Sequence, residues 1–189
     1  MKKDIILAGV GGQGILTIAT ILGHAALSRG WQLKQAEVHG MSQRGGDVQS
    51  HLRLSDATIW SDLIPMGQAD MIFSVEPMEA LRYLPYLHSE GWIITNSTPF
   101  KNIPNYPDVE AVYTQIRATK NHLLFDADTI AIDINARRAM NIVVLGAAIA
   151  KLGFSNEEIE ASIKAIFARK GENVVESNIA ALRAGMQIK

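Results

Sequence analysis

The chain has 189 residues, of which 48% are hydrophobic and 20% are charged, and it contains no cysteine. This length favours one domain whose core is large enough to fold without disulfides or a structural metal. The absence of cysteine excludes disulfides, cysteine nucleophiles, thiolate zinc sites and iron–sulfur clusters held by this chain. A formal charge of −1, from 18 basic and 19 acidic residues, argues against a nucleic-acid-binding surface.

The hydropathy pattern argues against a membrane protein. No apolar stretch approaches the roughly 20 residues that a membrane-spanning helix needs. The first nine residues resemble a signal peptide briefly, but glycines interrupt their apolar run at once, so a first strand is the better interpretation. We therefore expect a soluble, cytoplasmic protein that associates with neither membrane nor nucleic acid.

Strand-like segments occur along the first two thirds of the chain. Short apolar runs are typical of buried strands, and strict alternation is typical of strands with one partly exposed face. These patterns predict strands at residues 4–10, 32–38, 48–54, 57–60, 70–75, 92–96 and 111–116. Three of the six prolines fall between positions 99 and 107, which indicates an irregular loop there.

Helical patterns separate these strands and then dominate the C-terminal third. Apolar residues at helical spacing predict helices at residues 15–28, 77–87, 136–152, 155–167 and 173–183. Pro77 suits a first helical turn, and Ser155 with Glu158 forms a capping box. Strands alternating with helices, followed by helices alone, predict one α/β domain over residues 1–189. It would have a mainly parallel sheet flanked by helices and a helical C-terminal part.

A glycine-rich turn lies between the first predicted strand and the first helix. Residues 9–14 read Gly-Val-Gly-Gly-Gln-Gly and match G-x-G-x-x-G in the strand–turn–helix context of a Rossmann-like fold. Glu37 falls where a ribose-binding carboxylate would follow the second strand. A dinucleotide site is one interpretation, and glycines that only permit close strand–helix packing are the other. The candidate binding residues are Gly11, Gly12, Gln13 and Gly14.

A second unusual loop follows the second predicted strand. Residues 37–46 read Glu-Val-His-Gly-Met-Ser-Gln-Arg-Gly-Gly, and ligands in open α/β sheets bind beyond the carboxyl ends of strands. We expect this loop to flank the glycine turn and to offer donors to a phosphate or to a partner's cofactor. The alternative is a surface loop with an arginine salt bridge. The candidate binding residues are Ser42, Gln43, Arg44, Gly45 and Gly46.

No pattern in the sequence indicates a metal site or a catalytic nucleophile. His39 and His51 lack the spacing of a metal-binding pair, and no Gly-x-Ser-x-Gly elbow occurs. We therefore predict neither metal ligands nor a catalytic residue on this chain.

Together these motifs resemble the gamma-type domain of the 2-oxoacid:ferredoxin oxidoreductase family. The resemblance extends over essentially the whole chain and is most specific at residues 37–46, which are most similar to those of members acting on indolepyruvate. The segments that carry it are residues 9–14, 37–46, 76–82, 141–146 and 178–185.

This resemblance implies that the chain is a small subunit assisting the oxidative decarboxylation of an aryl pyruvate to an acyl-CoA. It implies thiamine diphosphate, magnesium and iron–sulfur clusters on a large partner subunit, with coenzyme A as cosubstrate and ferredoxin reached through the complex. The chain lacks cysteine and the Gly-Asp-Gly motif that holds thiamine diphosphate in similar enzymes. The two loops would then form a rim in which Arg44 meets a coenzyme A phosphate or a partner carboxylate. A stand-alone Rossmann-type dinucleotide-binding protein, or a docking-only subunit, are the alternatives.

Overall fold

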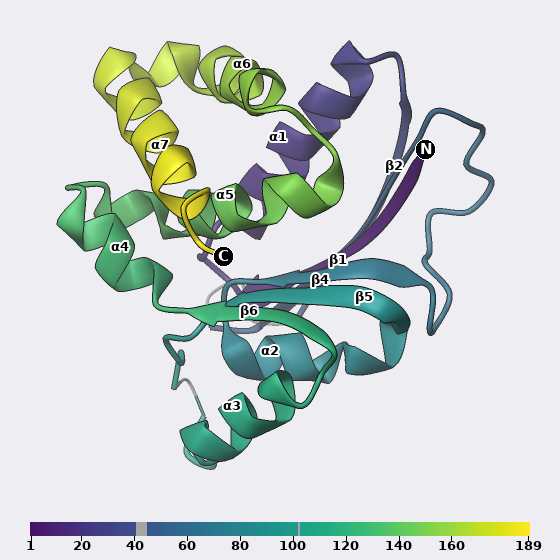
Figure 1. The fold of residues 1–189 in the computed structure, drawn as a ribbon, viewed down its shortest axis with the longest axis vertical. Helices are drawn as coiled ribbons and strands as arrows, with labels where there is room; N and C mark the ends of the chain where they lie inside the picture. The colour runs from purple at the N-terminus through teal and green to yellow at the C-terminus, as the bar shows by residue number, and fades with distance from the viewer. Residues whose placement is uncertain (41–44, 102) are drawn as a thin grey trace.

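A twisted β-sheet forms the centre of the molecule in the computed structural model, which describes residues 1–40, 45–101 and 103–189 (Figure 1). Over these residues, six strands pair in the order β2-β3-β1-β4-β5-β6. The strands are β1 (Lys2–Val10), β2 (Gln32–His39), β3 (Asp47–Ser55), β4 (Ala69–Ser74), β5 (Leu87–Asn96) and β6 (Asn121–Phe125). Strands β1, β4, β5 and β6 run parallel, whereas β3 is antiparallel to β1 and β2. The mainly parallel α/β sheet predicted from the sequence is confirmed.

Helices cover both faces of this sheet (Figure 1). The helices α1, α5, α6 and α7 lie on one face, and α2 and α3 lie on the other, while α4 packs against α5. Their bounds are α1 (Ile15–Ser28), α2 (Pro77–Arg82), α3 (Val109–Arg117), α4 (Ala127–Asp133), α5 (Met140–Leu152), α6 (Asn156–Phe167) and α7 (Glu172–Gly185). Among the described residues, no helix is both long and apolar enough to span a bilayer.

Strand β1 shows why a continuous apolar run marks a central strand. Ile5 and Leu7 point into the larger core, beneath α1 and α5, whereas Ile6 and Ala8 point into the smaller core beside α2 and α3. All four side chains are fully buried because β1 has a helical layer on each face. Burial on both faces removes the polar alternation that a half-exposed strand would show.

Two predicted strands are wrong. Residues 111–116 lie within helix α3, where the Asp108 side chain accepts a hydrogen bond from the Ala111 N–H at 2.9 Å and caps the helix. Val112 and Ile116 are buried at helical spacing, so a run rich in β-branched residues here serves one face of a helix. Residues 57–60 belong to the irregular loop between β3 and β4, and strand β6 was not predicted.

The predicted helix at residues 77–87 is shorter than expected. Helix α2 ends at Arg82, a short 3₁₀ turn (Leu84–Tyr86) follows, and β5 begins at Leu87. Pro85 cannot donate the backbone hydrogen bond that would continue the helix. The helix expected from residue 136 likewise begins with a separate 3₁₀ turn (Arg137–Ala139) before α5.

Helices α5 and α7 cross at two glycines. A Cβ atom on Gly146 would overlap the Leu182 carbonyl oxygen, and a Cβ on Gly185 would overlap the Val143 carbonyl oxygen. The two backbones therefore approach more closely than any larger residue would permit. This close approach joins the first half of α5 to the end of α7.

Candidate functional site

The glycine turn joins β1 to α1 at the carboxyl edge of the parallel strands. Gly12 and Gly14 have φ angles of 103° and 80°, which other residues rarely adopt. Gly9 serves packing instead, because a Cβ there would lie 2.6 Å from Val75 Cγ2. The turn thus combines both functions expected of its glycines: close strand–helix packing and backbone N–H groups left at the start of a helix.

Two side chains, from Gln13 and Asn141, hold this turn in shape. Gln13 Oε1 accepts a hydrogen bond from the Val10 N–H at 2.8 Å, so the side-chain carbonyl of this predicted binding residue serves the turn itself. Asn141, which is 8% exposed, donates from Nδ2 to the Gly14 carbonyl oxygen at 3.0 Å. Motif reasoning did not assign Asn141 to the site, although a buried amide in an otherwise apolar helix was an available signal.

A cavity of about 490 Å³ opens beside the glycine turn. Its walls come from the turn and α1, from the start of α5, and from the end of α6 with the first turns of α7. The residues with polar groups on these walls are Gly12, Gln13, Gly14, Thr17, Arg138, Asn141, Lys170, Asn173, Ser177 and Asn178. We call this cavity the turn pocket.

The turn pocket is suited to an anion. The start of α1 carries partial positive charge, and backbone N–H groups there have no partner within the helix. Arg138 and Lys170 add two cationic side chains from opposite walls. Across the described parts of the chain, the Arg138 side chain makes neither an ion pair nor a hydrogen bond with another residue. Its guanidinium can therefore bind a ligand without first breaking an internal interaction.

The second predicted loop lies beside the glycine turn, as expected. The Gly11 N–H donates to the Gly46 carbonyl oxygen at 2.8 Å, and the Gly45 N–H donates to the Gly11 carbonyl oxygen at 3.4 Å. Of the loop's predicted binding residues, only Gly45 and Gly46 can be placed. Ser42, Gln43 and Arg44 lie outside the described residues, so their assignment stays a prediction.

The position of Glu37 does not suit a dinucleotide site. Strand β3 lies between β1 and β2, so Glu37 pairs with Ser50, which in turn pairs with Leu7. Two inter-strand spacings, roughly 10 Å, separate Glu37 from β1. In a dinucleotide fold the ribose-binding carboxylate ends the strand next to the glycine turn. The position of Glu37 therefore argues against the dinucleotide interpretation of this glycine turn.

A second polar cluster lies at the same edge of the sheet, on the α2 side. The Tyr83 hydroxyl donates to both carboxylate oxygens of Asp47, at 2.9 and 2.8 Å, and Arg82 forms an ion pair with Glu79 at 2.7 Å. Glu79 is only 3% exposed. Burial, and then the neighbouring Asp47 carboxyl, raise the pKa of Glu79 to about 7 against the opposing effect of Arg82. This cluster supports the first residue of β3, directly after Gly46.

The described residues contain no group of three or more His, Asp or Glu side chains placed to hold a metal ion.

Comparison with known proteins identifies the family to which this chain belongs. The family of pyruvate ferredoxin/flavodoxin oxidoreductases matches residues 4–188, and the chain belongs to that family. Among curated proteins, it is 40% identical over 163 residues to the indolepyruvate oxidoreductase subunit IorB of Pyrococcus horikoshii, covering 82% of this chain and 80% of the relative. The corresponding protein of Archaeoglobus fulgidus is 35% identical over 196 residues, covering 98% and 94% of the two chains.

Solved structures share the fold. Subunit PORC of the pyruvate oxidoreductase of Thermotoga maritima superposes with a TM-score of 0.76 at 22% identity, covering 99% of this chain and 96% of that one. The 2-oxoglutarate:ferredoxin oxidoreductase of Magnetococcus marinus, with coenzyme A and succinyl-CoA bound, gives a TM-score of 0.77 at 18% identity. This chain corresponds to 30% of that longer chain. The same α/β unit therefore occurs both as a short chain and as part of a much longer one.

Proposed function

We propose that this chain is the small subunit of a cytoplasmic indolepyruvate:ferredoxin oxidoreductase and that residues 1–189 form its single gamma-type domain. The reaction would convert an aryl 2-oxoacid, coenzyme A and two oxidised ferredoxins into an acyl-CoA, carbon dioxide, two reduced ferredoxins and a proton. The observation that carries the proposal is the 40% identity to a protein named as an indolepyruvate oxidoreductase subunit over most of both chains.

The division of labour follows from what the chain lacks. Without cysteine it offers no thiolate for an iron–sulfur cluster. It also lacks the thiamine-binding pattern expected of the family's large chains. We therefore assign thiamine diphosphate, magnesium and the clusters to a large partner subunit, which would also meet ferredoxin. Indolepyruvate would be selected mainly by that partner.

The contribution of this chain would be to bind the anionic part of coenzyme A in the turn pocket. The N–H groups at the start of α1 would face a phosphate oxygen, with Arg138 and Lys170 neutralising its charge. Polar groups on α7, including Asn173 and Ser177, would orient the rest of the ligand. Arg44, on the adjacent loop, remains the predicted further cation for a phosphate or for a partner carboxylate.

Steady-state kinetics of the assembled complex test this proposal. The chain is co-expressed with the proposed large subunit, and reduction of ferredoxin by indolepyruvate and coenzyme A is followed. Replacing Arg138 by alanine should raise the KM for coenzyme A roughly tenfold, since a charge-assisted hydrogen bond contributes about 1.5–3 kcal/mol. The KM for indolepyruvate should not change.

Arg137 offers a matched control, because it belongs to the same 3₁₀ turn but not to the walls of the pocket. Equal effects of Arg137→Ala and Arg138→Ala on coenzyme A would contradict the role of the turn pocket. Failure of the two chains to co-purify, with partner activity unchanged when this chain is omitted, would contradict the subunit assignment. Saturable thermal stabilisation by NAD alone would favour the dinucleotide-binding alternative.

A further inference from the structure

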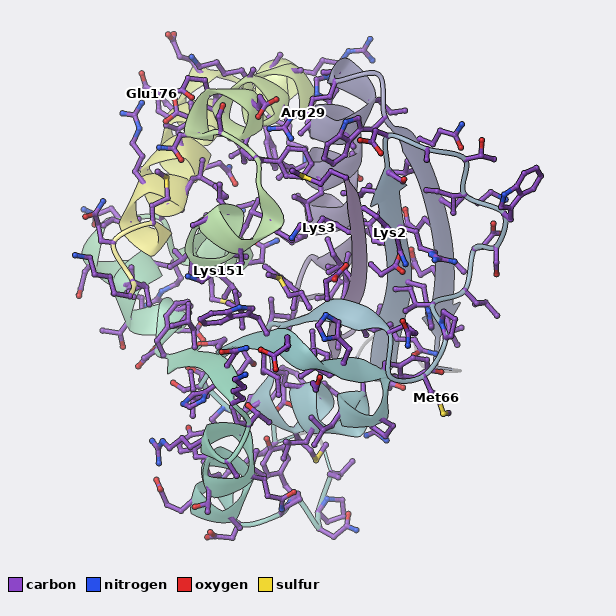
Figure 2. The ribbon with its side chains drawn as sticks, turned by 45° about the vertical axis from the view of Figure 1, so that its right-hand side comes forward. Lys2, Lys3, Arg29, Met66, Lys151 and Glu176 are labelled. Carbon is purple, nitrogen blue, oxygen red and sulfur yellow. The ribbon has the colours of Figure 1, made fainter. Side chains whose placement is uncertain are left out.

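An irregular loop at the opposite edge of the sheet exposes three large apolar side chains. It spans residues 56–68, between β3 and β4, and we call it the β3–β4 loop. Trp60 is 88% exposed, Leu63 58% and Met66 70%. Met66 projects away from the sheet at the margin of the molecule (Figure 2). These side chains recur every third residue, and they contribute nothing to either core.

The β3–β4 loop is fixed in place although it has no regular secondary structure. Ile59 and Ile64 are buried and anchor it to the body of the protein. The Ile59 N–H donates to Gln32 Oε1 at 3.0 Å, and the Ile64 N–H donates to His51 Nδ1 at 3.0 Å. Apolar side chains on a preorganised loop can be buried by a partner without the entropic cost of ordering the backbone.

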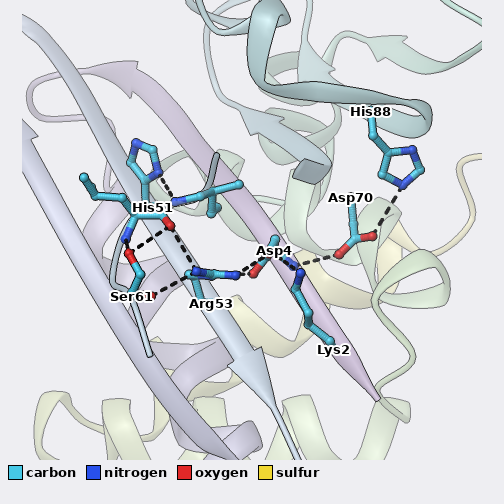
Figure 3. A network of polar contacts seen from close by, with 9 residues as sticks. Lys2, Asp4, His51, Arg53, Ser61, Asp70 and His88 are labelled. Carbon is cyan, nitrogen blue, oxygen red and sulfur yellow. Dashed lines mark hydrogen bonds and ion pairs between the residues drawn. The ribbon is translucent and has the colours of Figure 1, made fainter. Parts of the chain in front are cut away.

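Arg53 provides the strongest attachment of the loop (Figure 3). One of its terminal nitrogens donates to the carbonyl oxygens of Ser61 and Leu63, both at 3.0 Å. The remaining guanidinium N–H groups form a two-point contact with the fully buried carboxylate of Asp4, at 2.8 and 3.0 Å. A buried ion pair therefore holds the backbone between Trp60 and Leu63 in one position.

The charges around the exposed side chains are already paired within the chain. Lys34 and Asp62 form an ion pair at 2.9 Å, and the N-terminal amine pairs with Asp56. A partner therefore need not supply a countercharge here. The surface that fits this loop is apolar, with a pocket for the indole of Trp60.

A second copy of this chain does not fit that description. Trp60 is itself part of the wall of the recess beside the loop, about 240 Å³, whose other lining residues are Lys2, Asp4, Arg53, Ser55, Thr58, Ile59 and Ser61. The three apolar side chains expose on the order of 400 Å². Two loops packed face to face would thus bury about half of the roughly 800 Å² per chain that a stable complex needs. The patch is suited instead to anchoring a wider interface with a larger chain.

We infer that the β3–β4 loop docks against the large subunit of the oxidoreductase, with Trp60 inserted into an apolar pocket of that partner. This inference rests on the proposed function, which supplies the partner. Trp60 is then the energetic centre of the interface, because tryptophans inserted into a pocket are among the few residues that account for most of the binding free energy, and Leu63 packs beside it.

Dilution of the purified complex, followed by analytical ultracentrifugation, tests this inference. The double variant Trp60→Ser/Leu63→Ser should raise the dissociation constant at least thirtyfold. Leu27→Ser is the matched control, because Leu27 is an exposed leucine on α1 outside the loop, and it should leave the constant unchanged. Oxidation of Met66 by dilute hydrogen peroxide, followed by peptide mass spectrometry, should be at least fivefold slower in the complex than after dissociation.

The outcomes separate the two proposals. An active wild-type complex whose dissociation is unchanged by the double variant, with Met66 oxidised equally fast in both states, would overturn the docking inference and leave the proposed function standing. Absence of a wild-type complex would overturn both. Self-association of this chain that depends on Trp60 would also overturn the inference, because it would identify a second copy as the occupant.

Discussion

The two ends of the parallel strands, the amino edge and the carboxyl edge of the sheet, carry buried carboxylates that are paired differently. At the amino edge, the Asp4 carboxylate contacts two cations, Arg53 at 2.8 Å and Lys2 at 2.7 Å. At the carboxyl edge, two carboxylates, Asp47 and Glu79, lie beside the single guanidinium of Arg82. Asp4 thus contacts two cations, whereas Asp47 and Glu79 share one.

This difference matches what each edge supports. The fully paired network at the amino edge holds the β3–β4 loop in a fixed position. The underpaired network at the carboxyl edge gives Glu79 a pKa of about 7, so its protonation changes near neutral pH. Glu79 lies beside Asp47, and the chain from Asp47 leads directly to Gly46, which contacts the glycine turn. A loop held in place by a buried ion pair and a titratable support for the loop that contacts the glycine turn therefore occur at opposite ends of the same strand, β3.

Removing Arg53 from the amino edge should have the largest effect. In Arg53→Met, the buried Asp4 carboxylate loses its two-point partner, and only Lys2 remains. Breaking one side of a buried ion pair costs about 3–5 kcal/mol of unfolding free energy. Urea unfolding measures the loss, and Arg117→Met, which removes an exposed pair with Glu110, should cost less than about 0.5 kcal/mol. Similar losses for the two variants would show that the amino edge does not depend on this pair.

Replacing Glu79, the titrating residue at the carboxyl edge, should have a smaller, pH-dependent effect on the free energy of unfolding. The pKa of Glu79 rises from 4.5 to about 7 on folding, so the folded state binds this proton more tightly than the unfolded state. That contribution to stability is fully present below pH 4.5 and is lost as the pH rises through 7. Relative to Glu79→Gln, the wild type should lose at most about 3 kcal/mol of unfolding free energy between pH 4.5 and 8. Parallel stability curves for the two proteins would contradict the shifted pKa.

Much of this fold could be predicted because local sequence and tertiary environment agree. The continuous apolar run of β1 reports burial on both faces, and α1 has the bounds that its apolar spacing predicted, Ile15–Ser28. Prediction failed where the local sequence and the tertiary environment favour different structures. Helix α3 contains β-branched residues that favour strands, but it is capped by Asp108 and buries Val112 and Ile116 at helical spacing. Strand β6 has only five residues, all half-buried, and shows neither an apolar run nor a clear alternation.

Of the candidate site, only the glycine turn and the loop beside it could be predicted from the sequence. The glycine turn and the second loop both follow strand ends, so their contact through Gly11 and Gly46 follows from general rules for α/β sheets. The other walls of the turn pocket come from residues more than 120 positions away, among them Arg138 and Lys170. Arg138 in sequence resembles a solvated residue at the start of a helix. The positions of these walls depend on how α5 and α6 pack against α1 and α7, and no local pattern specifies that packing.

The smallest predicted effect concerns the hydrogen bond between the Ile64 N–H and His51, which requires a neutral imidazole. His51 Nδ1 accepts from the Ile64 N–H, and burial, with Arg53 nearby, lowers the pKa of His51 below 6.5. The folded state thus favours the neutral ring, so this contribution to stability is present above pH 6.5 and is lost as the pH falls through the folded-state pKa. Protonation would remove the acceptor, which costs about 1 kcal/mol. Amide hydrogen exchange of Ile64, corrected for intrinsic rates, should therefore accelerate on acidification. The Ile59 N–H is the control, because its acceptor, Gln32 Oε1, does not titrate. If both amides lose protection together, the loop opens as a whole and His51 is not its pH-sensitive attachment.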